Sequence, residues 1–194
     1  MSVLPAELRP ASGRLATFVD DLDRLLRDET SEPRIREQGT RLLAELIAQD
    51  DWLEPRHAVS DAASYQQFPL HVDAAGRFSV VAFVWGPGQA TPIHDHTVWG
   101  LIGVLRGAEI SQGYRYTGPD RMVEDGPPHR LDRGDVAEVS PMIGDVHRVR
   151  NAYADRTSIS IHVYGGDIGT LARSIYGEDG SRKPFVSGYS ASRR

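Results

Sequence analysis

Hydrophobic residues in the first quarter of the chain recur at the spacing of two amphipathic helices. Between residues 12 and 27 the apolar positions are Leu15, Phe18, Val19, Leu22, Leu25 and Leu26. Between residues 33 and 49 they are Ile35, Leu42, Leu43, Leu46 and Ile47. Spacings of three and four residues put each set on one side of a helix. The pattern predicts two packing helices, with Ser12 as N-cap of the first and Ser31 or Glu32 at the start of the second.

From Tyr65 onward the pattern changes to short β-branched and aromatic runs, separated by turns rich in Gly, Pro and Asp. These runs predict strands at Phe68–Val72, Phe78–Trp85, Thr97–Arg106, Ala108–Tyr116, His129–Leu131, Val136–Val139, Val146–Arg150 and Thr157–Tyr164. Eight short strands with regular turns are typical of a jelly-roll barrel. A short helix is predicted at Gly169–Tyr176. The fold class is therefore mainly β, with N-terminal α-helices and a short C-terminal helix.

The length of 194 residues fits a single domain. We expect a helical extension over residues 1–60 packed on a barrel that, with the last helix, spans residues 65–176, and a polar tail over 177–194. The net charge of −5, with arginines scattered among acids, argues against a nucleic-acid partner. No signal pattern or long apolar run is present, so we expect a cytoplasmic protein with no membrane partner, as a monomer or homodimer.

Two histidines in the stretch Pro92–Gly100 offer the first chemistry. On a strand, His94 and His96 would point to the same side, about 7 Å apart at the Cα, which suits two ligands of one metal ion. The chain has no cysteine, so further ligands must be imidazole or oxygen, and a cysteine nucleophile is excluded. Asp95 would face the opposite side, in a structural or supporting role.

The glycines around these histidines follow a known spacing. Five residues separate Gly88 from His94, three separate His96 from Gly100, and six separate Gly100 from Gly107. A second run places Gly134, Pro141, Gly144, His147 and Asn151 in order. The two runs resemble the motifs of the cupin superfamily, which implies a double-stranded β-helix with a metal ion held by His94, His96 and His147. The first cupin motif has a Glu where Gly100 stands. The resulting site of three neutral imidazoles leaves up to three positions open on a six-coordinate metal, and Gly100 leaves space for two substrates there.

A second group of polar residues alternates along the last predicted strand. Ser160, His162 and Tyr164 share one side, while Ile159, Ile161 and Val163 share the other. The apolar side can pack outward against the N-terminal helices. Burying three polar groups without partners would cost about 1–3 kcal/mol each, so we expect a hydrogen-bonded chain among them inside the barrel. Ser160 would fix the tautomer of His162, and His162 would hold the phenol of Tyr164 toward the metal.

A three-histidine cupin followed by Ser-x-His-x-Tyr resembles the thiol dioxygenases of the cysteine dioxygenase family, over about Tyr65–Tyr176. The resemblance implies Fe(II), dioxygen, and a small thiol that is converted to a sulfinic acid. In the mammalian type a cysteine cross-links to the tyrosine. Gly100 falls at about that place here, so Tyr164 would act unmodified.

The resemblance to bacterial 3-mercaptopropionate dioxygenases rests on two further residues. Gln67, or its neighbour Gln66, stands where cysteine dioxygenases have a carboxylate-binding arginine, and Arg173 matches an arginine that follows the Ser-x-His-x-Tyr strand. A substrate carboxylate would then meet Arg173 or Tyr164. Trp99 would either wall the pocket or belong to the core. We interpret His57, His71 and His129 as ordinary residues without a metal role.

Several alternatives stay open at this point. The substrate could instead be cysteine or mercaptosuccinate. A cupin with zinc, manganese or nickel could act as an isomerase or oxygenate another substrate, because three histidines with an open position also suit catalytic zinc. A non-enzymatic cupin that binds a small molecule is the third class.

Overall fold

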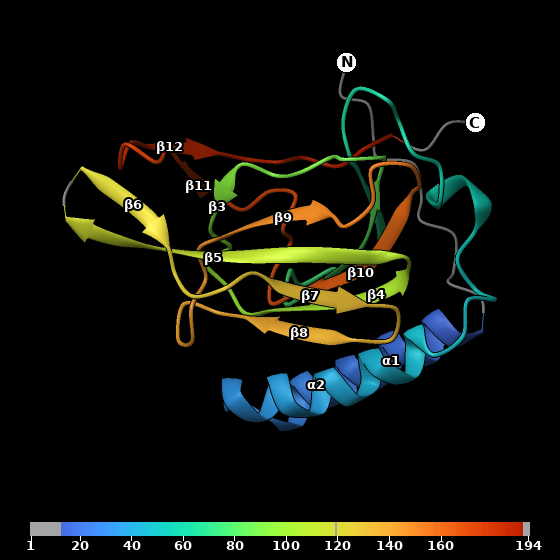
Figure 1. Cartoon of the computed structure of the whole chain (residues 1–194). Helices are drawn as coiled ribbons and strands as arrows, with labels where there is room; N and C mark the ends of the chain where they lie inside the picture. Colours follow the sequence, from blue (N-terminus) through green and yellow to red (C-terminus); the bar gives the residue numbers. More distant parts are fainter. Residues whose placement is uncertain (1–12, 119, 192–194) are drawn as a thin grey trace, which may run out of the picture.

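The computed structural model describes residues 13–118 and 120–191, which form two helices followed by a β-rich region (Figure 1). The helices are α1 (Arg14–Asp28) and α2 (Glu32–Ile47), and a short 3-10 helix, η1, covers Pro55–His57. Both predicted helices are confirmed to within two residues. Ser31 is the N-cap of α2, and Pro33 lies in its first turn. The predicted cap Ser12 lies outside the described residues.

One antiparallel sheet carries the most buried strands of the molecule. Its order is β1-β2-β10-β4-β8. The strands are β1 (Gln66–Val72), β2 (Ser79–Trp85), β10 (Ser158–Tyr164), β4 (Gly100–Arg106) and β8 (Val136–Val139). Every residue of β2 and β10 is buried, because helices cover one side of this sheet and a second sheet faces the other.

The second sheet has the order β12-β11-β3-β9-β5-β6, and β7 also pairs with β5. Its strands are β12 (Arg182–Phe185), β11 (Arg173–Tyr176), β3 (Ile93–His94), β9 (His147–Asn151), β5 (Ala108–Gly118), β6 (Arg121–Glu124) and β7 (His129–Asp132). The two sheets face each other as a double-stranded β-helix without closing into a continuous barrel. This confirms the predicted cupin architecture with N-terminal helices.

The helices pack on the outer side of the first sheet (Figure 1). Ile159, Ile161 and Val163 join Leu22, Leu43 and Ile47 in one buried cluster, as the alternation along β10 predicts. Each such side chain contributes about 1.5–3 kcal/mol on burial. Gly103 permits the close approach of α2, since a Cβ there would lie 2.9 Å from Ile47 and 3.0 Å from Leu43. The opposite side of the sheet is left free to line the interior between the sheets.

The predicted last helix, Gly169–Tyr176, is wrong. Residues 168–170 form a turn, and the segment from Arg173 to Tyr176 is the extended strand β11. Its backbone pairs with β12 on one edge and β3 on the other. The carboxylate of Asp95 also accepts a hydrogen bond from the Ser174 N–H. An eight-residue helix is marginal by itself, and these partners satisfy the same backbone groups in extended form.

The C-terminal segment, which was predicted as a polar tail, contains regular secondary structure. Within residues 177–191 the strand β12 forms, and Ser190 exchanges two hydrogen bonds with the backbone of Gln67 on β1. The sequence pattern also did not indicate β3 and β6, which are only two and four residues long. Short strands carry too few residues for a recognisable alternation.

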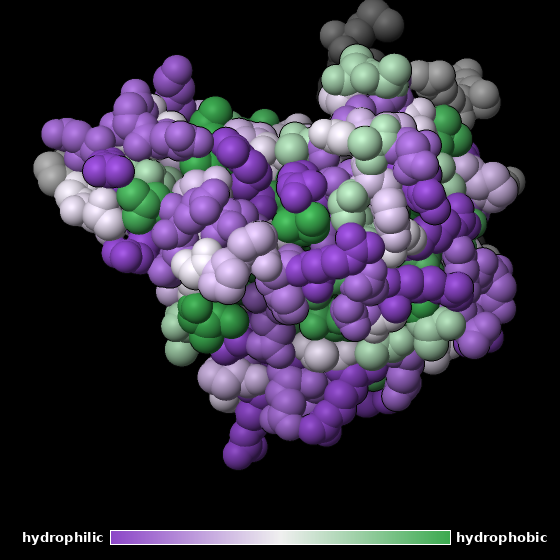
Figure 2. Space-filling view, viewed as in Figure 1, coloured by the Kyte–Doolittle hydropathy of each residue, from purple (hydrophilic) through white to green (hydrophobic). Residues whose placement is uncertain are grey.

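The outer surface is largely hydrophilic in the view of Figure 2, including the lower edge that the helices form. Neither helix of the described residues combines the length and apolar character needed to cross a membrane.

Candidate metal centre

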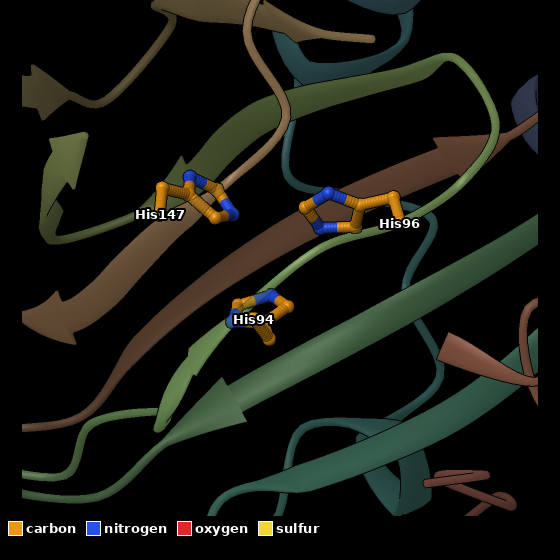
Figure 3. Close-up of side chains that lie close together, drawn as sticks. All are labelled: His94, His96 and His147. Carbon is orange, nitrogen blue, oxygen red and sulfur yellow. The ribbon is translucent and has the colours of Figure 1, made fainter. Parts of the chain in front are cut away.

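Three buried histidines converge between the two sheets (Figure 3). One ring nitrogen from each of His94, His96 and His147 lies within 4.8 Å of the others. The ring centroids are 4.8–4.9 Å apart, and the side chains are 1–7% exposed. The three rings therefore point at one another across a space of the size that a single metal ion would fill.

Two elements of the second sheet bring the ligands together. His94 on β3 is the direct register partner of His147 at the start of β9. His96 follows β3, just before Thr97, which has a left-handed backbone with φ of 63°. Pairing of β3 with β9 thus joins two residues that are 53 positions apart in the chain, and the turn after His96 aims the third ring at them.

Each histidine has its Nδ1 atom engaged by a neighbour. The Nδ1 of His94 lies 3.0 Å from the carbonyl of Pro92, and that of His147 lies 3.0 Å from the Ser111 hydroxyl. The Nδ1 of His96 lies 2.8 Å from a carboxylate oxygen of Asp145. Such contacts fix ring orientation and tautomer at metal sites. They leave the three Nε2 atoms as the donors available to a metal ion.

The electrostatics of the site favour neutral imidazoles. Burial, with the neighbouring His96, lowers the pKa of His94 to about 3. Burial and the adjacent histidines also hold the pKa of His147 well below its ordinary value. Neutral imidazole is the form that binds metals. The donor set fits a divalent transition metal that accepts three nitrogen ligands and keeps open positions.

Asp145 is a site residue that the sequence reasoning missed. One oxygen contacts His96 Nδ1, and the other accepts the backbone N–H groups of His96 and Thr97, both at 2.9 Å. Burial acts to raise the pKa of Asp145, but the hydrogen bonds from His96 and Thr97 outweigh it and keep the pKa low. The available signal was its position two residues before His147, within the second motif. Its carboxylate holds both the ring and the turn.

Asp145→Asn is expected to weaken metal binding by about 10- to 100-fold, because an amide cannot accept all three hydrogen bonds. Calorimetric titration of the metal-free protein with Fe(II) under nitrogen measures the effect. Asp155→Asn is the matched control, since Asp155 is exposed and pairs only with Arg156. Equal metal affinity of Asp145→Asn and the unmodified protein would contradict the role assigned to Asp145.

Ser160, His162 and Tyr164 form the hydrogen-bonded chain expected of them. Ser160 Oγ lies 2.8 Å from His162 Nε2, and His162 Nδ1 lies 2.8 Å from the Tyr164 hydroxyl. The indole N–H of Trp85 donates to Ser160 Oγ at 3.1 Å. The His162 ring stacks on Phe83 at 4.0 Å between centroids. Ring stacking and hydrogen bonds at both nitrogens hold the imidazole in one orientation.

Tyr164 connects this chain to the histidine cluster. Its ring stacks on that of His96 with centroids 5.5 Å apart. Burial raises the pKa of the phenol well above its ordinary value, so the hydroxyl stays protonated across the physiological range. Burial likewise lowers the pKa of His162 and keeps it neutral. The arrangement presents a neutral O–H group beside the candidate metal position.

Neighbouring side chains fill the space beside Gly100. A Cβ at this position would lie 2.9 Å from Tyr164 Cδ1 and 2.9 Å from Val139 Cγ2. Gly100 therefore makes room for the tyrosine ring that points toward the histidines.

Gly100→Ala is expected to displace Tyr164 and lower the free energy of unfolding by about 1–3 kcal/mol, the usual cost of overpacking. Metal content should stay at the level of the unmodified protein, because no histidine moves. Chemical denaturation and metal analysis check both statements. Gly118→Ala is the control, since a Cβ there meets no atom within 4 Å. Equal stability of the two variants would contradict the packing argument.

Arg173 is the first residue of β11, the strand that pairs with β3, and not part of the helix predicted for this segment. It is 5% exposed. One Nη atom donates to Ser187 at 2.7 Å, the guanidinium covers the Phe185 ring at 4.6 Å, and Nε has no hydrogen-bond partner. Among the described residues no carboxylate forms an ion pair with it. A buried cation with an unused donor is suited to an anionic ligand.

The two glutamines differ in orientation. Gln67 is the register partner of Phe83, whose ring stacks on His162, so its side chain belongs to the inner side of the sheet. Gln66 has the opposite orientation, and its amide donates to Ser64. The structure therefore separates the two candidates in favour of Gln67, which shares the side of the sheet that carries Ser160, His162 and Tyr164.

The remaining candidates lie away from the centre. Asp95 accepts hydrogen bonds from the Ser174 N–H and the Tyr176 hydroxyl, and so joins β3 to β11. Trp99 packs against the helix-covered cluster, which favours its interpretation as a core residue. The ring of His57 lies tilted against Phe68 and that of His71 stacks on Phe78, and neither residue belongs to the three-histidine cluster. His129 is an exposed residue of β7.

Comparison with known proteins identifies relatives across most of the chain. The model of the family described as "Cysteine dioxygenase type I" matches residues 14–173. Cysteine dioxygenase type 1 of Danio rerio is 24% identical over 152 residues, which cover 70% of this chain and 73% of the relative. The matched range includes all three histidines, the Ser160–His162–Tyr164 chain and Arg173.

Solved structures with similar folds include a protein with a double-stranded beta-helix domain from Klebsiella pneumoniae. It has a TM-score of 0.47 and 16% identity, and the match covers 70% of this chain and 97% of that one. An RmlC-like cupin protein from Desulfovibrio desulfuricans has a TM-score of 0.43 and 22% identity, with coverages of 60% and 95%.

Proposed function

Because the chain belongs to the cysteine dioxygenase type I family, we propose that it is a metal-dependent thiol dioxygenase that uses Fe(II). The reaction adds both atoms of dioxygen to the sulfur of a small thiol, R–SH + O2 → R–SO2H, and balances without a further reductant. The observation that carries the proposal is the buried three-histidine cluster beside the protonated hydroxyl of Tyr164.

His94, His96 and His147 would hold the ion through their Nε2 atoms. Fe(II) bound there supplies a Lewis acid that keeps the thiol deprotonated and a redox-active ion that reacts with dioxygen. The protein needs no strong base at the sulfur for this reason. Asp145, Ser111 and the Pro92 carbonyl keep the three imidazoles oriented.

Tyr164 would donate a hydrogen bond to the bound reactants. Ser160 and His162 act through the tyrosine by fixing the position of its oxygen. The apolar rings of Phe83 and Trp85, with Val149 and Ile168, form a buried cluster around Tyr164 and exclude water from this side of the site. A hydrogen bond in such a water-poor site is stronger than one in bulk solvent.

Arg173 would bind the carboxylate of the substrate, and Gln67 would lie on the same inner surface. The carboxylates nearest to Arg173 are already engaged, Asp145 by His96 and Asp95 by Ser174 and Tyr176. A substrate amine would therefore lack an anionic partner among them. This favours 3-mercaptopropionate over cysteine.

Oxygen consumption by the Fe(II)-loaded protein tests the function. We expect the highest kcat/KM with 3-mercaptopropionate, lower values with cysteine and mercaptosuccinate, and the lowest with cysteamine, which has no carboxylate. Protein loaded with Zn(II) is the control and should consume no oxygen. Absence of oxygen consumption with every thiol would reject the dioxygenase proposal, and a preference for cysteine would reject the substrate assignment alone.

A further inference from the structure

Glu109 is a fully buried acid that the proposed mechanism does not use. It lies on β5 opposite Asn151 of β9 and Leu131 of β7, on the inner side of the second sheet that also carries Ser111. Its exposure is 0%, and neither carboxyl oxygen has a hydrogen-bond partner among the described residues. A polar group buried in this way calls for a specific explanation.

Its register partner Asn151 is not available as a partner. The Asn151 amide group donates to the carbonyls of Trp85 and Gly86, and its oxygen accepts from Ser158 and from the N–H of Tyr153. Among the described residues no cation forms an ion pair with Glu109 either. An ionised carboxylate without a counter-charge is strongly disfavoured at such a place. Accordingly, burial raises the pKa of Glu109 to about 7, although the Ser160 hydroxyl and the Trp85 indole act in the opposite direction.

The carboxyl of Glu109 faces Ser160, the first member of the chain that leads to Tyr164. A serine hydroxyl has one proton to donate and two lone pairs that accept. One lone pair of Ser160 takes the indole N–H of Trp85, which can only donate. Ser160 therefore has one lone pair and one proton left for His162 and Glu109. It accepts a hydrogen bond from one of these two residues and donates its proton to the other.

The direction of the whole chain follows from the charge on Glu109. A neutral acid donates to Ser160, so Ser160 donates to His162 Nε2, and His162 Nδ1–H donates to the oxygen of Tyr164. The phenol proton is then free for the substrate. An ionised carboxylate instead accepts from Ser160, so His162 carries its proton on Nε2, and Tyr164 must donate to His162. In that state the tyrosine presents only lone pairs to the substrate.

We propose that Glu109 is a positioning residue that, as a neutral acid, donates a hydrogen bond to Ser160. Ser160 then donates to His162 and His162 donates to Tyr164, which leaves the Tyr164 proton aimed at the substrate. The inference rests on the proposed function, in which Tyr164 donates to the reactants. The hydrogen bond from Glu109 to Ser160 is itself part of the proposal, since the two groups face each other without forming it in this structure.

Among the described residues, no arginine or lysine lines the cavity beside Glu109. A cavity of about 250 Å³ reaches its side chain, and the titratable residues that share this lining are Asp125, His129 and Glu138. Asp125 pairs with Arg115, and Glu138 pairs with Arg36. Titratable groups on the inner sides of the adjoining strands β9 and β10 are His147, His162 and Tyr164, all buried and neutral. Because exposed His129 shares the lining, solvent protons can reach the acid through this cavity.

Nitrogen NMR of the histidine side chains tests the proposal without any turnover. The protein is loaded with diamagnetic Zn(II), and His162→Ala assigns the His162 signals. At about pH 6 the unmodified protein should hold His162 with its proton on Nδ1, and this tautomer should decline as the pH rises through the pKa of about 7. In Glu109→Gln, which has no titratable group there, the tautomer should not change with pH. An Nε2–H tautomer at pH 6, or the same pH transition in Glu109→Gln, would overturn the proposal.

Turnover by the Fe(II)-loaded protein supplies a second readout. At about pH 6 Glu109→Gln should retain kcat within about threefold, because the amide still donates, whereas Glu109→Leu should lose about tenfold, the value of one hydrogen bond. The fall in kcat of the unmodified protein above neutral pH should be absent in Glu109→Gln. Asp125→Asn, which changes a charge on the rim of the same cavity, should keep that fall. An equal loss in Glu109→Gln and Glu109→Leu would reject the role as a neutral donor.

The two readouts separate this inference from the proposed function. Absence of thiol turnover in every protein, together with the expected NMR result, would reject the function and leave the orienting role of Glu109 intact. Normal turnover, together with a His162 tautomer that is the same with and without Glu109, would support the function and reject the orienting role of Glu109.

Discussion

Tyr164→Phe is expected to lower kcat/KM for thiol oxygenation by about 100-fold or more while the protein still binds its metal ion. The change removes only the hydroxyl that lies 2.8 Å from His162 Nδ1, and loss of a positioned proton donor commonly costs 10²–10⁴-fold in rate. The phenyl ring would keep its place against His96 and beside Gly100, so the histidine ligands should not move. Steady-state oxygen uptake and metal analysis of the same samples measure the two quantities.

Tyr114→Phe is the matched control for this experiment. Tyr114 is also a buried tyrosine, but it packs with Ile93 and Met122 in a cluster apart from the one that contains Tyr164. The control should keep both activity and metal. Loss of metal in Tyr164→Phe would show that the tyrosine serves the metal site and not the reaction, and full activity would remove it from the mechanism.

Arg173→Gln is expected to raise KM for 3-mercaptopropionate by about 10- to 100-fold, the usual value of a hydrogen-bonded charge contact. The guanidinium is buried, has an Nε without a partner, and forms no ion pair with a carboxylate among the described residues. Its cation would therefore gain most of its compensating charge from the substrate. For cysteamine, which has no carboxylate, KM should change by less than about threefold.

Arg182→Gln controls for the loss of a positive charge from the same hairpin. Arg182 is exposed on β12 and lies 4.0 Å from Asp95, so its removal should leave KM for both thiols unchanged. An equal rise in KM for 3-mercaptopropionate and cysteamine in Arg173→Gln would contradict a carboxylate-binding role and point to a general disturbance of β11.

The periodicity of the sequence predicted the elements that are long enough to show a repeating pattern of hydrophobic residues. Helix α2 and strand β10 carry enough consecutive positions for their spacing to indicate both the element and its buried side. Strand β11 was misinterpreted as a helix because its conformation depends on β3 and β12, which lie far from it in the sequence. A four-residue segment has little intrinsic preference, and its neighbours decide.

In the candidate site, too, local sequence patterns indicated some residues, and others depend on contacts between distant parts of the chain. His94, His96 and His147 stand in motifs with glycines at regular spacing, and Ser160, His162 and Tyr164 alternate on one strand, so local patterns indicated both groups. Asp145 lies within the second motif and Glu109 on a predicted strand, but neither pattern indicates a partner about 50 positions away, His96 for Asp145 and Ser160 for Glu109. Next to the turn at Gly107, Glu109 is typical of a solvent-exposed position. Only the pairing of β5 with β9 and β7 places it in the interior.

Isotope labelling of the product tests the central claim most directly. The Fe(II)-loaded protein is given 3-mercaptopropionate under ¹⁸O₂ in ordinary water, and the product is analysed by mass spectrometry. A thiol dioxygenase transfers both atoms of one dioxygen molecule, so we predict a sulfinic acid in which both sulfinate oxygens carry the label. A product with one labelled oxygen or none, or oxidation to the disulfide alone, would contradict the account.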